Sequence, residues 1–216
     1  MKIEIWSDFI CPFCYMGKHA FETALAEFPH RDEVEVVFRS YELDPEADSL
    51  SGVKVDDILA RKYGMSLKRI KATNEDLQRR AKRHGLEFNH LEAQIETNTF
   101  NAHRIAKYAA EQGKGAEMTE QLMKAHFTDC LSIGDPETLI RLGVQIGLEQ
   151  SELEAVINSD AFASLVRADM LEAEQLEVAS VPFFAFDRKY SASGTLPAKS
   201  FTDMLNKVWA ENHPVL

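Results

Sequence analysis

Two cysteines separated by two residues are the side chains with the clearest potential chemistry in this chain. The stretch Cys11-Pro12-Phe13-Cys14 follows a predicted strand and opens a predicted helix. A thiolate is the nucleophile in disulfide exchange, and the free N–H groups and dipole of a helix start stabilise it. Pro12 suits the first helical turn, because the N–H that it lacks would have no partner there. The pattern predicts a redox-active dithiol, with Cys11 facing solvent and Cys14 more buried.

A zinc site is the alternative interpretation of the same two cysteines. Its support is His126 and Cys130, which lie four residues apart on one predicted helix face. The β-α-β context of Cys11 and Cys14 favours redox chemistry, and the chain has no second closely spaced cysteine pair. We therefore predict no metal at this site, and we predict that Cys130 is a small buried apolar residue.

The elements around the cysteine pair form a predicted β-α-β unit. Ile3 and Ile5 alternate with polar neighbours, which predicts a strand over about residues 2–7. The following helix is indicated by apolar residues at helical spacing, namely Phe21, Ala24, Leu25 and Phe28. A second strand is predicted within residues 34–43, which are rich in β-forming side chains.

The middle of the chain has a helical pattern, from about residue 53 to 177. Asp135 before Pro136 indicates a helix start, and Asn98 is a natural N-cap for another helix. Residues 151–154 have the S-x-x-E form of a capping box. This part of the chain is therefore predicted to be a block of several helices.

Strand character returns near the end of the chain. Residues 183–186 and 189–192 predict a β-hairpin around Asp187. A last helix is predicted after Pro197, with apolar positions at Phe201, Leu205, Val208 and Trp209. The order is thus β-α-β, a helical block and β-β-α, so the two terminal pieces can form one sheet with the helices inserted between them.

Composition and charge exclude several classes of protein. The 216 residues include 45% apolar and 27% charged residues, which are ordinary values for a globular protein. The formal net charge of −11 disfavours nucleic acid and anionic membranes as partners. Three cysteines do not form a disulfide framework and suit a reducing compartment, so we expect a cytoplasmic protein.

Motif and element order together resemble the DsbA-like branch of the thioredoxin superfamily, and within it the FrnE-like proteins. The resemblance covers essentially the whole chain. It rests on Asp8–Cys14, Val181–Phe184, Tyr41–Pro45, Asn98–Arg104 and the segment from Phe127 to Pro136. The fold that it implies is α/β, a thioredoxin-like fold interrupted by an α-helical insertion domain. Residues 1–47 and 177–216 would form the thioredoxin-like domain, and residues 48–176 the insertion.

The resemblance also implies roles for individual residues. Cys11 becomes the attacking thiol and Cys14 the resolving thiol, while Pro182 becomes a cis-proline beside them. The backbone of Val181 would hold an extended substrate chain. The remaining substrate-binding candidates are Pro12, Phe13, Asn98 and His103. Asn98 is equally well explained as an N-cap, and His103 as a structurally hydrogen-bonded histidine.

The activity implied is that of a thiol–disulfide oxidoreductase or isomerase. Its partners would be disulfide-containing proteins or low-molecular-weight thiols, with glutathione as a possible co-substrate and no metal or organic cofactor. Glutathione-dependent transferases and 2-hydroxychromene-2-carboxylate isomerases share the layout but usually have serine where Cys11 stands. A chaperone or helical binding module with a structural C-x-x-C is the non-enzyme alternative. No oligomeric state is predicted.

Overall fold

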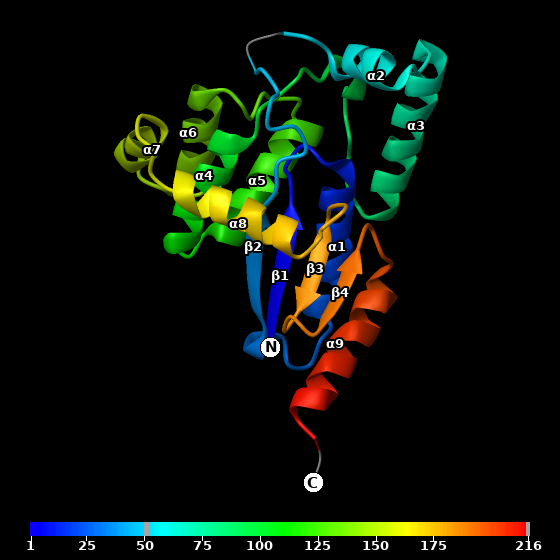
Figure 1. Cartoon of the computed structure of the whole chain (residues 1–216), viewed down its shortest axis with the longest axis vertical. Coiled ribbons are helices and arrows are strands. Elements are labelled where there is room, and N and C mark those ends of the chain that lie inside the picture. The colour runs from blue at the N-terminus through cyan, green and yellow to red at the C-terminus, as the bar shows by residue number, and fades with distance from the viewer. Residues whose placement is uncertain (50–51, 215–216) are drawn as a thin grey trace. The chain divides into compact units, whose positions relative to one another are not determined.

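The computed structural model of the chain describes residues 1–49 and 52–214. Strands and helices follow one another in the predicted order, β-α-β, a helical block and β-β-α (Figure 1). The elements are β1 (Lys2–Ser7), α1 (Pro12–Ala26), the short 3-10 helix η1 (Arg31–Glu33), β2 (Glu35–Ser40), α2 (Val55–Tyr63), α3 (Leu67–Arg83), the 3-10 helix η2 (Leu91–Ala93), α4 (Phe100–Glu111), α5 (Gly115–Phe127), α6 (Pro136–Gln145), α7 (Gln150–Ile157), α8 (Ala163–Gln175), β3 (Phe183–Phe186), β4 (Tyr190–Ser193) and α9 (Ala198–Asn212).

The chain forms two compact units. The first joins Met1–Tyr41 to Asp169–Leu216, and the second is Glu42–Ala168. Both boundaries precede those expected from the sequence, which lay after residues 47 and 176. The second one falls inside α8, because the side chain of Asp169 in that helix binds Arg39 and the backbone N–H of Ser40.

The first unit is built on a four-stranded sheet in the order β2-β1-β3-β4. Strands β1 and β2 are parallel and are connected through α1, whereas β3 pairs antiparallel with both β1 and β4. Ile5 of β1 lies opposite Phe38 of β2 and Phe184 of β3. The β1 strand is therefore central, and the loop after its carboxyl end starts α1 at Cys11.

One face of this sheet carries the apolar core of the first unit. Ile3 and Ile5 point to the same face because they are two residues apart in a strand. They pack with apolar residues of α1 and α9, which lie together on this face (Figure 1). The fully buried aromatic residues of the cluster are Phe21, Phe184, Phe186 and Phe201.

Alternate residues of β1 face the other side, where a carboxylate is buried. The side chain of Glu4 is 2% exposed and binds two guanidinium groups: Arg39 at 2.5 Å and Arg188 at 2.6 Å. Two carboxylates of α8 complete the set, with Asp169 bound to Arg39 at 2.9 Å and Glu172 bound to Arg188 at 2.7 Å. These five residues are called the Glu4 ion cluster below.

The second unit is helical, as predicted, but its helix starts agree only in part with those expected from the sequence. Asp135 does cap α6, since its side chain accepts a hydrogen bond from the N–H of Thr138. The predicted capping box at Ser151 is wrong, because α7 begins at Gln150 after Glu149. Helix α8 begins at Ala163, just after Phe162 takes a left-handed backbone conformation with φ of 64°.

The side chain of Arg104 connects two helices of the second unit. The guanidinium of Arg104 in α4 donates to backbone carbonyls at the end of α7 and just beyond it, those of Val156, Ser159 and Ala161. Carbonyls at a helix end lack partners within the helix, so a cation there stabilises the end.

Within residues 1–49 and 52–214, no helix is both long and apolar enough to cross a membrane.

Candidate dithiol site

The site lies at the start of α1, where β1 has ended. Cys11 is the N-cap residue of α1, and Pro12 is its first helical residue. The N–H groups of Cys14 and Tyr15 donate to the Cys11 carbonyl at 3.0 and 3.3 Å, which closes the first turn. This turn places both thiols on one side of the helix start, as the spacing of the motif predicts.

Both cysteines are buried. Cys11 is 4% exposed and Cys14 is 1% exposed. The expectation that Cys11 faces solvent is therefore wrong. One cause is that the backbone carbonyl of Val181 lies 3.8 Å from the Cys11 sulfur and covers it.

The two thiols differ sharply in acidity. A hydrogen bond from the Cys14 thiol, with help from the backbone N–H groups of Cys14 and Phe13, lowers the pKa of Cys11; burial and the Asp8 carboxylate oppose this. Burial, followed by the hydrogen bond to Cys11, raises the pKa of Cys14 well above its usual range. The site can therefore hold one thiolate, and that thiolate is on Cys11.

The start of α1 forms one wall of the site, and Val181 and Pro182 form the other. The peptide bond between them is cis, as predicted, and it directly precedes β3. Gly17 in α1 allows the approach of Pro182, because a Cβ on Gly17 would lie 2.8 Å from the Pro182 Cγ. The sequence analysis missed this role, although a glycine inside a predicted helix is a recognisable signal of close packing.

A loop between β4 and α9 connects the two walls. The N–H of Gly194 donates to the Pro182 carbonyl at 2.8 Å. The hydroxyl of Thr195, the next residue, donates to the Phe13 carbonyl at 3.0 Å. Neither residue has a local sequence signal for this role, because Thr195 lies 182 residues from Phe13.

The remaining candidates, Asn98 and His103, belong to the second unit, whereas the cysteines belong to the first. Both polar atoms of the Asn98 amide are engaged there: Oδ1 accepts from the N–H of Phe100 at 3.0 Å, and Nδ2 donates to the Pro45 carbonyl at 3.1 Å. The N-cap of α4 is Thr99, so the predicted N-cap at Asn98 is wrong by one residue, although its Oδ1 binds the N–H of the first helical residue, Phe100. His103 lies within α4 and is 2% exposed.

The residues expected for the zinc alternative do not share a helix. His126 lies in the last turn of α5, which ends at Phe127, whereas Cys130 follows in a left-handed conformation with φ of 54°. Cys130 is half-buried rather than buried, and partial burial raises its pKa. In the part of the chain that the structure describes, neither Cys11 nor Cys14 belongs to a group of three potential metal ligands.

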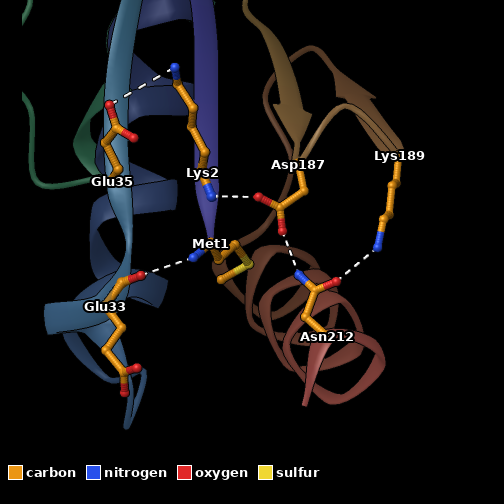
Figure 2. A pocket seen from close by; sticks show the side chains of 7 residues that line it. All are labelled: Met1, Lys2, Glu33, Glu35, Asp187, Lys189 and Asn212. Carbon is orange, nitrogen blue, oxygen red and sulfur yellow. Dashed lines mark hydrogen bonds and ion pairs between the residues drawn. The ribbon is translucent and has the colours of Figure 1, made fainter. Parts of the chain in front are cut away.

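A shallow depression of about 580 Å³ lies at the other end of β1 (Figure 2). Figure 2 shows that its polar groups already bind one another. Asp187, for example, accepts hydrogen bonds from the Lys2 N–H and the Asn212 amide, both at 2.6 Å, and Lys189 binds the same Asn212 at 2.8 Å. Because these polar groups are engaged with one another, the dithiol remains the candidate site.

Fold and site together define a dithiol protein with a thioredoxin-like sheet and a helical insertion. The model of the DSBA-like thioredoxin domain family matches residues 2–206. The chain therefore belongs to this family.

Solved structures agree with this assignment. A probable DsbA oxidoreductase from Streptomyces coelicolor is 42% identical, with a TM-score of 0.93 over 100% of this chain and 93% of that chain. The cytosolic disulfide reductase DsbM from Pseudomonas aeruginosa shares the fold at 18% identity, with a TM-score of 0.63 over 98% of this chain and 97% of its own. A second structure of DsbM, with GSH, has a TM-score of 0.57.

A curated relative carries no assigned activity. The uncharacterized protein YwbO of Bacillus subtilis is 27% identical over 185 residues, which are 85% of this chain and 86% of YwbO.

Proposed function

We propose that this protein is a thiol–disulfide oxidoreductase in which Cys11 attacks the substrate and Cys14 resolves the intermediate. The observation that carries the proposal is the pair of buried thiols at the start of α1, with the Cys11 sulfur 3.8 Å from the Val181 carbonyl. The opposite directions of the two thiol pKa shifts support it. A low-pKa thiol supplies a nucleophile near neutral pH, and a high-pKa partner stays protonated until it is needed. Membership of the DsbA-like family supports the same chemistry.

The reaction consists of two exchanges in which one pair of electrons moves. The Cys11 thiolate attacks one sulfur of a substrate disulfide, which forms a Cys11–substrate disulfide and releases the first substrate thiolate. Cys14 then loses its proton and attacks the Cys11 sulfur, which releases the second substrate thiolate and leaves a Cys11–Cys14 disulfide. The substrate gains two electrons, the enzyme loses two, and an external dithiol restores the enzyme.

Substrate recognition is assigned to the backbone beside the cysteines. Val181 lies two residues before β3, and its backbone groups can pair with an extended peptide in the manner of an added strand. Phe13, which is 37% exposed, offers an apolar contact next to the thiols. Disulfide-containing proteins and small thiols such as glutathione are the proposed substrates, and the solved complex of DsbM with GSH supports the second class.

No metal or organic cofactor is needed for this chemistry, because two sulfur atoms carry both electrons. Three cysteines in the sequence do not make a disulfide framework and fit a compartment that keeps thiols reduced, so a cytoplasmic location is part of this proposal. Disulfide isomerisation, the activity expected of FrnE-like relatives, needs the same Cys11 thiolate and the release of the substrate before Cys14 attacks.

The test is the reduction of insulin disulfides with dithiothreitol as the electron source. Wild-type protein should accelerate insulin precipitation, Cys11→Ser should abolish the acceleration, and Cys130→Ser should keep it as the matched control. Refolding of a scrambled disulfide protein measures isomerisation with the same three proteins. The proposal fails if Cys11→Ser is as active as wild type. Glutathione conjugation that survives in Cys11→Ser would favour a transferase, and suppression of aggregation that needs neither cysteine would favour a chaperone.

A further inference from the structure

The loop formed by Gly194 and Thr195 contacts both walls of the dithiol site. The Gly194 N–H binds the carbonyl of Pro182, and the Thr195 hydroxyl binds the carbonyl of Phe13. Gly194 has a φ of 80°, a left-handed conformation that favours glycine. Two consecutive residues of one loop therefore connect the α1 wall to the wall in front of β3.

The carbonyl that Thr195 binds belongs to a peptide unit with a second function. The C=O of Phe13 and the N–H of Cys14 are the two ends of one peptide group. That N–H is among the donors that lower the pKa of the Cys11 thiol. A donor on the carbonyl of a peptide group polarises it, which strengthens the hydrogen bond made by the N–H at its other end.

We propose that Thr195 is a positioning residue of the dithiol: its hydroxyl holds and polarises the Phe13–Cys14 peptide, so that the Cys14 N–H stabilises the Cys11 thiolate. The contribution of Thr195 to catalysis rests on the proposed function. The Thr195 hydroxyl binds the Phe13 carbonyl and acts on the thiolate through the Phe13–Cys14 peptide. We assign this role to the hydroxyl and not to the methyl group of Thr195. The residue is half-buried in a loop and lies outside the apolar core, so its methyl group does not pack there.

The distinguishing variants change the hydroxyl and the shape of residue 195 separately. Thr195→Val keeps the shape and removes the donor, whereas Thr195→Ser keeps the donor and removes a methyl group. Ser193→Ala is the matched control, because its hydroxyl belongs to the same segment but binds that of Ser180 at 2.8 Å instead of the α1 wall. If Thr195→Val does not fold, Thr195→Ala serves in its place.

The measurement is the rate of alkylation of Cys11 by iodoacetamide as a function of pH, resolved by peptide mass mapping. Thr195→Val should react about two- to fivefold more slowly than wild type at pH 7, which is the factor expected for one lost hydrogen bond to a polarised group. Its pH profile should shift to higher pH. Thr195→Ser and Ser193→Ala should overlay the wild type.

Equilibration with glutathione is the second readout. Since the thiolate stabilises the reduced form, Thr195→Val should favour the disulfide form by about the same two- to fivefold factor. The proposal is overturned if the Thr195→Val profile overlays the wild type, or if Thr195→Ser is as slow as Thr195→Val. Alkylation needs no turnover, so failure to reduce insulin would reject the proposed function and leave this test intact.

Discussion

Two regions of the first unit lower the pKa of a buried acid by different means. At the carboxyl end of β1, hydrogen-bond donors without full charge lower the pKa of Cys11. On one face of the same strand, Arg188 and Arg39 lower the pKa of Glu4 from 4.5 to about 2. The first arrangement leaves a thiol whose pKa is lowered without a full charge beside it as the cause. The second keeps a carboxylate ionised down to about pH 2.

The difference shows how the protein separates reactivity from stability. Full charges would attract counter-charges to the dithiol and fix one protonation state, whereas dipoles stabilise a thiolate and still allow it to be protonated. Ionic partners are placed instead where Glu4 bonds the sheet to Arg188 and to α8, through Asp169 and Glu172. Changes in the ion cluster should therefore alter folding, and changes at the dithiol should alter chemistry.

The largest expected effect comes from breaking the ion cluster. Glu4→Gln leaves two guanidinium groups without their shared carboxylate, and loss of one partner of a buried ion pair costs about 3–5 kcal/mol. Because the Arg188 side chain is 50% exposed, we expect about 3 kcal/mol less stability in urea unfolding.

The control for this variant is Asp203→Asn, which removes a carboxylate from an exposed pair with Lys199 and should cost less than about 0.5 kcal/mol. Alkylation of Cys11 in the folded Glu4→Gln protein should match the wild type. A slower alkylation rate in that variant would show that the two regions are not separate.

Lowering the pH should remove the contribution of the Glu4 carboxylate to folding stability without a mutation. The folded pKa of Glu4 is depressed, so its contribution is fully present above about pH 4.5 and is lost as the pH falls towards about 2. The fall of the Glu4 pKa from 4.5 to about 2 corresponds to about 3 kcal/mol. The gap in unfolding free energy between wild type and Glu4→Gln, measured in urea at several pH values, should close over this range. A gap that stays constant down to pH 2 would contradict the assignment.

Crowding the dithiol should have an intermediate effect. Gly17→Ala puts a methyl group 2.8 Å from the Pro182 Cγ, and overpacking of this kind costs about 1–3 kcal/mol. Elsewhere in a helix the same change would stabilise by up to about 1 kcal/mol. Urea unfolding should therefore show a loss of about 2 kcal/mol. The double variant with Pro182→Ala should be less destabilised than the sum of the single variants; strict additivity would mean that the contact is not responsible.

Labelling should show the asymmetry of the two thiols directly. Because the pKa of Cys11 is lowered and that of Cys14 is raised, Cys11 should react with iodoacetamide at least about tenfold faster at pH 7. Peptide mapping after brief labelling measures the ratio, with half-buried Cys130 as the internal reference. Faster labelling of Cys14 would reverse the proposed roles.

The smallest effect is expected from a charge added beside the thiols. Phe13→His offers a donor and a potential cation at a position that is 37% exposed, so it should lower the pKa of Cys11 and make the protein more oxidising. We expect a rise in potential of about 20 mV, somewhat less than the 30 mV that corresponds to a tenfold change for two electrons. Glutathione titration measures it. A more negative potential would show that Phe13 does not limit the stability of the thiolate.

Local signals in the sequence predict most of this fold. Strand β1, the Pro12 start of α1 and the β3–β4 hairpin follow from periodicity and turn residues within a few positions. The cis bond before Pro182 was expected from the family resemblance and is present. The capping box at Ser151 failed because the N-cap of α7 is Glu149, two residues earlier.

Contacts between distant segments could not be predicted from the sequence. Burial of Cys11 depends on the Val181 carbonyl, and the link to Thr195 joins positions far apart in the chain. The same holds for Glu4, whose guanidinium partner Arg188 lies 184 residues away. Periodicity assigns a residue to a face of its own element, but it does not say which side chain of another element lies opposite.

The separation of the two walls along the chain also affects synthesis. Val181 lies 170 residues after Cys11, and ribosomes add about 5–20 residues per second, so about 10–35 s pass between them. Throughout that interval the nascent chain carries both thiols, while the carbonyl that covers Cys11 and the strand that pairs with β1 do not yet exist. The redox state of the compartment in which translation occurs therefore decides whether Cys11 and Cys14 enter the finished fold as two thiols or as a disulfide.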